Sequence, residues 1–134
     1  MKKLLLVLTM LGCGSTTQNL SVTSILLVDE QTSVQALMFD AISFTIDTNV
    51  MTDPALLVSI AATAPINLVV MDAANFAIFQ DGGSATGRFD SGPTTGSNID
   101  LPMTDSGTFH LILDNRAGET AVLVTIRGEI FWQE

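Results

Sequence analysis

Hydrophobic and polar residues alternate along much of the chain with the period of two that is typical of half-buried β-strands. The clearest example is the segment 121–132, in which nearly every second residue is apolar. These apolar positions are Val122, Val124, Ile126, Ile130 and Trp132. The pattern predicts one long strand with a bend or bulge at Gly128, because glycine inside a strand often marks such a site.

Further strands are predicted upstream of this segment. Residues 42–46 and 109–113 show the same alternation. Other apolar runs lie between turn residues and are too short for ordinary helices, so we expect strands buried on one or both sides. These runs span residues 25–28, 56–60, 66–71 and 76–79.

Three parts of the chain are less regular. Residues 34–40 could form a helical turn or the start of a strand, and 72–75 suits a short 3-10 turn. The region 81–102 is rich in Gly, Ser, Thr, Asp and Pro, with 86–89 and 97–101 as candidate edge strands. Seven to nine short strands without a sustained helical period predict an all-β fold, an antiparallel β-sandwich or jelly roll.

The beginning of the chain has the composition of a secretory signal peptide. Two lysines precede an apolar run from Leu4 to Leu11, and polar residues follow after Cys13. A membrane-spanning helix needs ~20 apolar residues, more than this run provides. We therefore expect a signal peptide over 1–12, a tether over 13–20 and a β-sandwich domain over 21–134. The alternative is that the first residues form a helix or strand of the fold.

The stretch Met10-Leu11-Gly12-Cys13 resembles the lipobox of bacterial lipoproteins. Gly12 and Cys13 match that pattern, whereas Met10 and Leu11 depart from it. The resemblance implies that Cys13 receives a lipid anchor, and Gly14 after it implies sorting to the outer membrane. The alternative is ordinary cleavage near Gly12, with Cys13 free or lost and the domain secreted.

Charge excludes two classes of partner. The 134 residues contain 14 Asp plus Glu and 5 Lys plus Arg, a net charge of -9. Without the signal peptide, three arginines remain against the 14 acids, which gives -11. Such a chain cannot neutralise a row of phosphates, so nucleic acid and anionic lipid headgroups are excluded as partners.

A second resemblance covers about half of the chain. It rests on the segments 66–72, 75–79, 107–115 and 121–131, which include the strand Gly107-Thr108-Phe109 and the pair Asp114-Asn115. Their order is similar to the plan of GOLD-like and emp-type cargo-adaptor domains, which implies a β-sandwich without catalysis. No transmembrane helix or coiled coil follows, so a cargo-transport role is not implied. Exported protease-associated β-sandwiches with a Gly-Thr-Phe strand are a second similar group.

Catalytic patterns are absent from the sequence. His110 is the only histidine, and no nucleophile elbow or phosphate-binding glycine motif occurs. We therefore expect a protein that is not an enzyme and has no cofactor. Acidic residues in the glycine-rich loops could bind a ligand or Ca²⁺ through carboxylate oxygens. These are Asp81, Asp90, Asp100 and Asp105. The alternative is that they form turns and keep the domain soluble.

These observations predict a cell-envelope lipoprotein, held in the membrane through Cys13, whose non-catalytic domain binds a protein partner. Edge strands or the loops between Asp81 and Pro102 are the expected contact region. One alternative is a subunit of a secreted assembly in which a neighbour completes an open edge strand. Another is a carbohydrate-binding or hydrolase-accessory domain, although we expect Trp132 to close the core rather than stack on a sugar.

Overall fold

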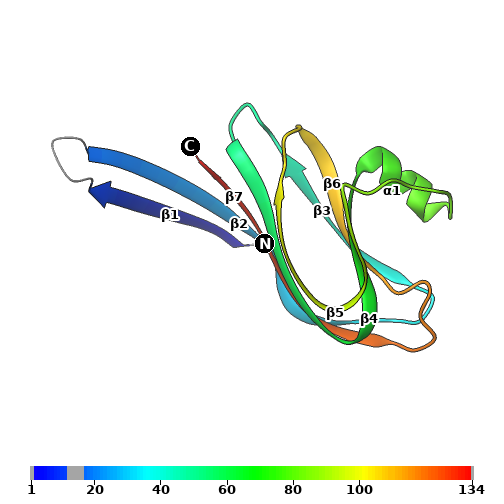
Figure 1. Cartoon of the computed structure of the whole chain (residues 1–134). Helices are drawn as coiled ribbons and strands as arrows, with labels where there is room; N and C mark the ends of the chain where they lie inside the picture. Colours follow the sequence, from blue (N-terminus) through cyan, green and yellow to red (C-terminus); the bar gives the residue numbers. More distant parts are fainter. Residues whose placement is uncertain (1, 12–16, 134) are drawn as a thin grey trace.

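A computed structural model describes the backbone of residues 2–11 and 17–133 and the side chains of residues 21–133. Cys13 and the predicted cleavage site lie outside the described residues. Figure 1 shows the arrangement of seven strands and one helix. The elements are β1 (Lys2–Leu11), β2 (Thr17–Val34), β3 (Phe39–Ile46), β4 (Thr52–Asp72), α1 (Ala73–Gln80), β5 (Phe89–Pro102), β6 (Gly107–Asp114) and β7 (Val122–Gln133).

All strand pairs are antiparallel, and the sheet order is β1-β2-β7-β4-β6-β3, with β5 paired to β4. The long strand β4 joins two layers, because residues 55–62 pair with β7 and residues 67–72 pair with β6. Strand β5 follows β4 through both layers. The sheet therefore curls into a half-barrel (Figure 1), which confirms the predicted all-β, sandwich-like fold.

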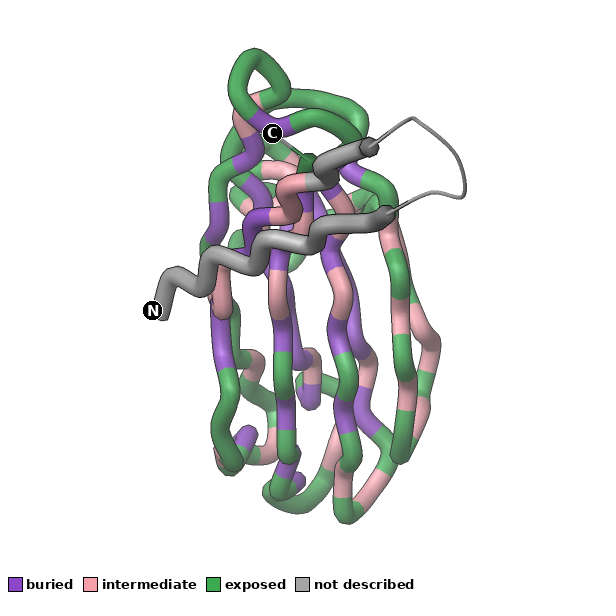
Figure 2. The backbone as a smooth tube through the Cα atoms, turned by 90° about the vertical axis from the view of Figure 1, so that its left-hand side faces the viewer, coloured by how far each residue is buried: buried purple, intermediate pink, exposed green. Residues whose placement is uncertain are grey.

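The core lies between the two layers. Figure 2 shows buried and exposed positions alternating along the long strands, and the five apolar residues predicted on one face of β7 are all buried. Gly128 also faces inward, where a Cβ atom would lie 3.5 Å from Leu111 Cδ2 of the opposite layer. The irregularity predicted at Gly128 occurs on the neighbouring strand, where the register shifts between Leu26 and Val28.

The prediction of a strand at 76–79 is wrong, because these residues belong to helix α1. Asp72 caps the helix: its Oδ1 accepts hydrogen bonds from the backbone N–H of Asn75 at 2.8 Å and from the side-chain amide of Asn75 at 3.0 Å. These bonds hold the pKa of Asp72 below its usual value. Phe79 is buried against Ile112 on the outer face of the second layer, with Phe76 beside it. Helix α1 therefore covers that face, and Phe76 and Phe79 are the aromatic residues through which it packs.

The structure resolves the three irregular regions of the sequence. The segment 34–40 contains the end of β2, a turn, and the start of β3. The two candidate edge strands at 86–89 and 97–101 are not separate elements, because residues from Phe89 onward form the single strand β5. The first turn of α1 takes the place of the short 3-10 turn expected after Asp72.

Candidate functional site

The four candidate aspartates are all exposed, and they lie at different places in the fold. Asp81 ends α1, and its backbone N–H donates to Ala77 O at 3.2 Å. Asp90 accepts a hydrogen bond from the Gly92 N–H at 2.9 Å. These two residues therefore have the turn and cap roles that short acidic residues commonly play.

Asp105 and Asp100 have different surroundings. Asp105 accepts a 2.6 Å hydrogen bond from Arg88, and this bond, followed by one from the Thr104 hydroxyl, lowers the pKa of Asp105. Asp100 projects from the outer face of β5, and no side chain among residues 21–133 forms a hydrogen bond or ion pair with it. Within the part of the chain that the structure describes, no group of three His, Cys, Asp or Glu side chains could hold a metal ion.

Asp100 lies on the rim of a groove of about 440 Å³ on the outer face of β5, β4 and β7. Strand register places Leu57 of β4 directly opposite both Asp100 and Glu129, so an apolar residue separates two carboxylates. Phe131 lies two residues after Glu129, on the same face of β7, and extends this apolar floor. The complete lining is Leu57, Val58, Ser59, Asn98, Ile99, Asp100, Arg127, Glu129 and Phe131.

The charge of the groove is negative. Arg127 is its only lining cation, and its guanidinium pairs with Glu129 and, at 2.9 Å, with Asp29 on β2. The groove and its border therefore contain one arginine, Arg127, and three carboxylates, those of Asp29, Glu129 and Asp100. Because Asp100 is not paired within residues 21–133, it is the carboxylate available to a bound cation.

Strand β5 forms one border of the groove and has an open edge, since β4 is its only strand partner among the described elements. Its central part bends, and local side chains satisfy the backbone there: Thr94 Oγ1 accepts from the Gly96 N–H at 3.1 Å, and Ser91 Oγ donates to Gly92 O at 2.7 Å. Residues 97–101 lie within strand β5 and pair in continuous register with residues 60–56 of β4. This segment therefore presents an extended edge beside Asp100.

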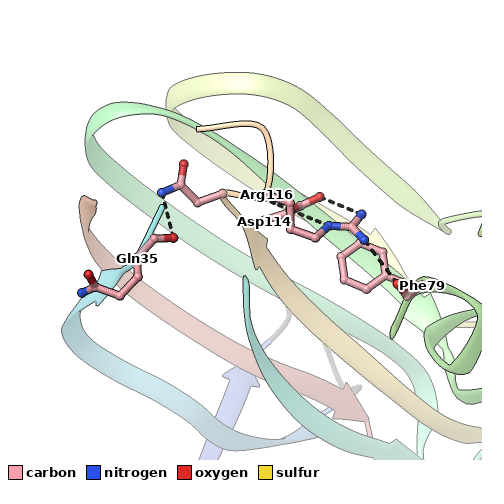
Figure 3. A network of polar contacts seen from close by, with 5 residues as sticks. Gln35, Phe79, Asp114 and Arg116 are labelled. Carbon is pink, nitrogen blue, oxygen red and sulfur yellow. Dashed lines mark hydrogen bonds and ion pairs between the residues drawn. The ribbon is translucent and has the colours of Figure 1, made fainter. Parts of the chain in front are cut away.

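A second cluster of polar and aromatic residues links α1 to the loop between β6 and β7 (Figure 3). Arg116 donates two hydrogen bonds to the Asp114 carboxylate, at 3.0 and 3.2 Å, and one to Phe79 O at 3.2 Å. Its guanidinium carbon lies 3.5 Å from the centroid of the Phe79 ring. This network consists of satisfied contacts that hold the helix against the sheet, so it leaves no group free for a ligand.

His110 lies next to the same helix. Its ring stacks on Phe76 with centroids 3.9 Å apart, and burial lowers the pKa of the imidazole. Trp132 is buried in the core, as the sequence predicts. Neither His110 nor Trp132 lines the groove.

Sequence reasoning identified Asp100 but missed the rest of the groove. The alternation in 121–132 did place Arg127 and Glu129 on the outward face of their strand. Their meeting with Leu57 and Asp100 depends on the pairing of three strands that are distant in sequence, which the local pattern does not determine.

Comparison with models of known protein families gives no match, and comparison with curated proteins gives none either. No helix among the described residues is long and apolar enough to cross a membrane.

Proposed function

We propose that this protein is a cell-envelope lipoprotein whose domain binds a protein partner at the groove between β5 and β7 and along the adjoining open edge of β5. The lipid on Cys13 is the membrane anchor, and the curled sheet presents the groove to the partner. The protein has no catalytic role of its own. The residues that contact the partner are on β4, β5 and β7.

The observation that carries this proposal is the coincidence of an apolar groove with an open strand edge. Leu57 and Phe131 form a floor with polar groups around it, which is the usual composition of a binding site. The edge of β5 at residues 97–101 offers backbone donors and acceptors to an added strand. This region lies within the interval from Asp81 to Pro102 that the sequence predicts as the contact region.

A carbohydrate-binding role receives less support from the same geometry. Sugar sites present exposed aromatic rings, but Trp132 is buried and Phe89 packs against the core. Phe131 is the one aromatic side chain that lines the groove. Binding of an extended protein segment uses both the groove and the strand edge.

The binding proposal is tested by co-purification of the tagged full chain from detergent-solubilised membranes of the native host. The variant Leu57→Glu places a charge on the groove floor, and Asn98→Arg fills the groove from an exposed position. The matched control is Leu123→Glu, which makes the same change on β7 away from the groove. Trp132 fluorescence during urea unfolding verifies that each variant is folded.

We expect one protein, identified by mass spectrometry, to co-purify in stoichiometric amount with wild type and Leu123→Glu and to be lost from both groove variants. A partner that is retained by folded Leu57→Glu and Asn98→Arg contradicts the proposal, as does the absence of any stoichiometric partner.

The anchor is tested separately by the intact mass of the protein from the membrane fraction, beside Cys13→Ser. We expect the mass of residues 13–134 plus acyl chains, and an unprocessed or released variant. Unmodified protein in the medium contradicts lipidation and favours a freely secreted domain or a subunit of an extracellular assembly.

A further inference from the structure

We propose that the bound partner segment is an extended strand that pairs with the open edge of β5 at residues 97–101 and places a lysine or arginine side chain against Asp100. This inference rests on the proposed function and specifies the chemistry of the partner. It concerns the backbone conformation of the segment and the charge of one of its side chains.

The backbone part follows from the edge of β5. Residues 97–101 pair with residues 60–56 of β4 in continuous register, so the pairing is regular where the segment borders the groove. The bend at 90–96, with Gly92 at a φ of 65°, interrupts that regularity further along the strand. An incoming strand therefore has its longest uninterrupted pairing surface beside Asp100.

The charge follows from the outward face of this segment. A residue directly opposite Asp100 on an added antiparallel strand would have its Cβ about 5 Å from that of Asp100, within reach of an ion pair. A long basic side chain on the added strand can bring its charged end to the Asp100 carboxylate while its aliphatic stem lies along β5. Lysine and arginine can form this ion pair, whereas a purely apolar side chain cannot.

A second copy of this chain is a poor source of that cation. Without the proposed signal peptide the chain contains no lysine, and its three arginines already pair with carboxylates: Arg88 with Asp105, Arg116 with Asp114, and Arg127 with Asp29 and Glu129. Strand β5 contains no lysine or arginine, and edge-to-edge pairing of two copies would bring acidic strands together. Without the signal peptide the net charge is -11, from 14 acidic residues and three arginines, so the chain is expected to attract a basic partner rather than itself.

The test uses the full chain in a non-ionic detergent and three synthetic peptides with capped ends. The first is a seven-residue peptide of alternating valine and threonine with a central lysine. The second has norleucine in place of lysine, which keeps the aliphatic stem without the charge. The third keeps lysine but carries N-methyl groups on alternate residues, which block hydrogen bonding along one strand edge. Binding of fluorescent versions is measured by anisotropy at low and high salt.

We expect the lysine peptide to bind about threefold more tightly than the norleucine peptide at low salt, as for an exposed ion pair. The difference should disappear in Asp100→Asn. The control Asp90→Asn makes the same charge change on the same strand, keeps an oxygen acceptor for Gly92, and should retain the difference. N-methylation should weaken binding at least tenfold, because it removes the pairing hydrogen bonds.

Equal affinities of the lysine and norleucine peptides, or a lysine preference that survives Asp100→Asn, would overturn the assignment of the basic side chain. Undiminished binding of the N-methylated peptide would overturn strand addition. Concentration-dependent self-association that the lysine peptide competes away would identify a second copy as the occupant and overturn the inference. If these results occur while the co-purifying partner is still lost from Leu57→Glu and Asn98→Arg, this inference fails and the proposed function stands.

Discussion

Replacement of Asn115 by alanine should strongly destabilise the fold, although the residue lies in a loop. Asn115 is 2% exposed, and its Nδ2 lies within hydrogen-bonding distance of Val34 O, Gln35 O and Thr120 O, at 3.0, 3.1 and 2.9 Å. Its side chain therefore joins the end of β2 to the loop that precedes β7.

The magnitude follows from these contacts. The side-chain amide has two hydrogens, which are shared among the three carbonyl acceptors, so we count two hydrogen bonds. Each bond contributes about 1 kcal/mol net, and leaving a buried carbonyl without a donor costs a further 1–3 kcal/mol. We expect Asn115→Ala to lower the free energy of unfolding by about 3–5 kcal/mol. Asn115→Asp keeps the shape of the side chain but turns a carboxylate toward carbonyl oxygens, so at neutral pH it should cost at least as much.

The assay is urea unfolding of the full chain in non-ionic detergent, followed through the fluorescence of Trp132, the single tryptophan. The carbonyl oxygens should raise the pKa of the new carboxyl in Asn115→Asp, because they disfavour its charged form. The folded variant then holds its proton to higher pH than the unfolded chain, so its deficit relative to wild type should shrink as the pH falls toward the unfolded pKa. A loss below 1 kcal/mol for Asn115→Ala, or a deficit in Asn115→Asp that does not change with pH, would refute this account of the loop.

Three further predictions concern the core, a strained turn and the histidine. Ile126→Ala, which empties a fully buried position on β7, should cost about 2–5 kcal/mol in the same urea assay, and a cost below 1 kcal/mol would contradict its place in the core. Leu37 has a φ of 66° and is 71% exposed, so Leu37→Gly should remove strain and change stability by between 0 and about +1 kcal/mol; a clear loss would show that the side chain is held by a partner. His110 has a lowered pKa, so the unfolded chain takes up its proton at higher pH than the folded chain, and stability should fall as the pH drops below 6.5. His110→Phe keeps the stack on Phe76 and should reduce this acid loss, as measured by unfolding between pH 7 and pH 5; an unchanged pH profile would assign the acid loss to other groups.

The strand content was predictable because strand periodicity is a local property. In 122–132 every apolar residue of the predicted inward set is buried, and Gly128 faces the same side. Helix α1 was missed because its apolar residues form a short run with no clear period. Its formation depends on the cap at Asp72 and on packing of Phe79 against Ile112, a residue of a strand that comes later in the chain.

The groove was predictable only in part. The outward positions of Arg127 and Glu129 follow from the alternation on β7, and Asp100 was selected as an acidic residue in a polar region. The contact between these positions depends on β4, which pairs with β5 on one side and β7 on the other at Leu57. That register is set by the packing of the whole sheet and not by any local signal.

The most direct test of the account is photo-cross-linking in living cells of the native host, with a photoreactive amino acid in place of Asn98 in the full chain. Asn98 is an exposed groove residue on β5, and Ser84, exposed in the loop after α1, is the control position. The account predicts a cross-link from position 98, and not from position 84, to one envelope protein at a segment that contains lysine or arginine. No protein adduct at position 98, or adducts only to a second copy of this chain, would contradict it.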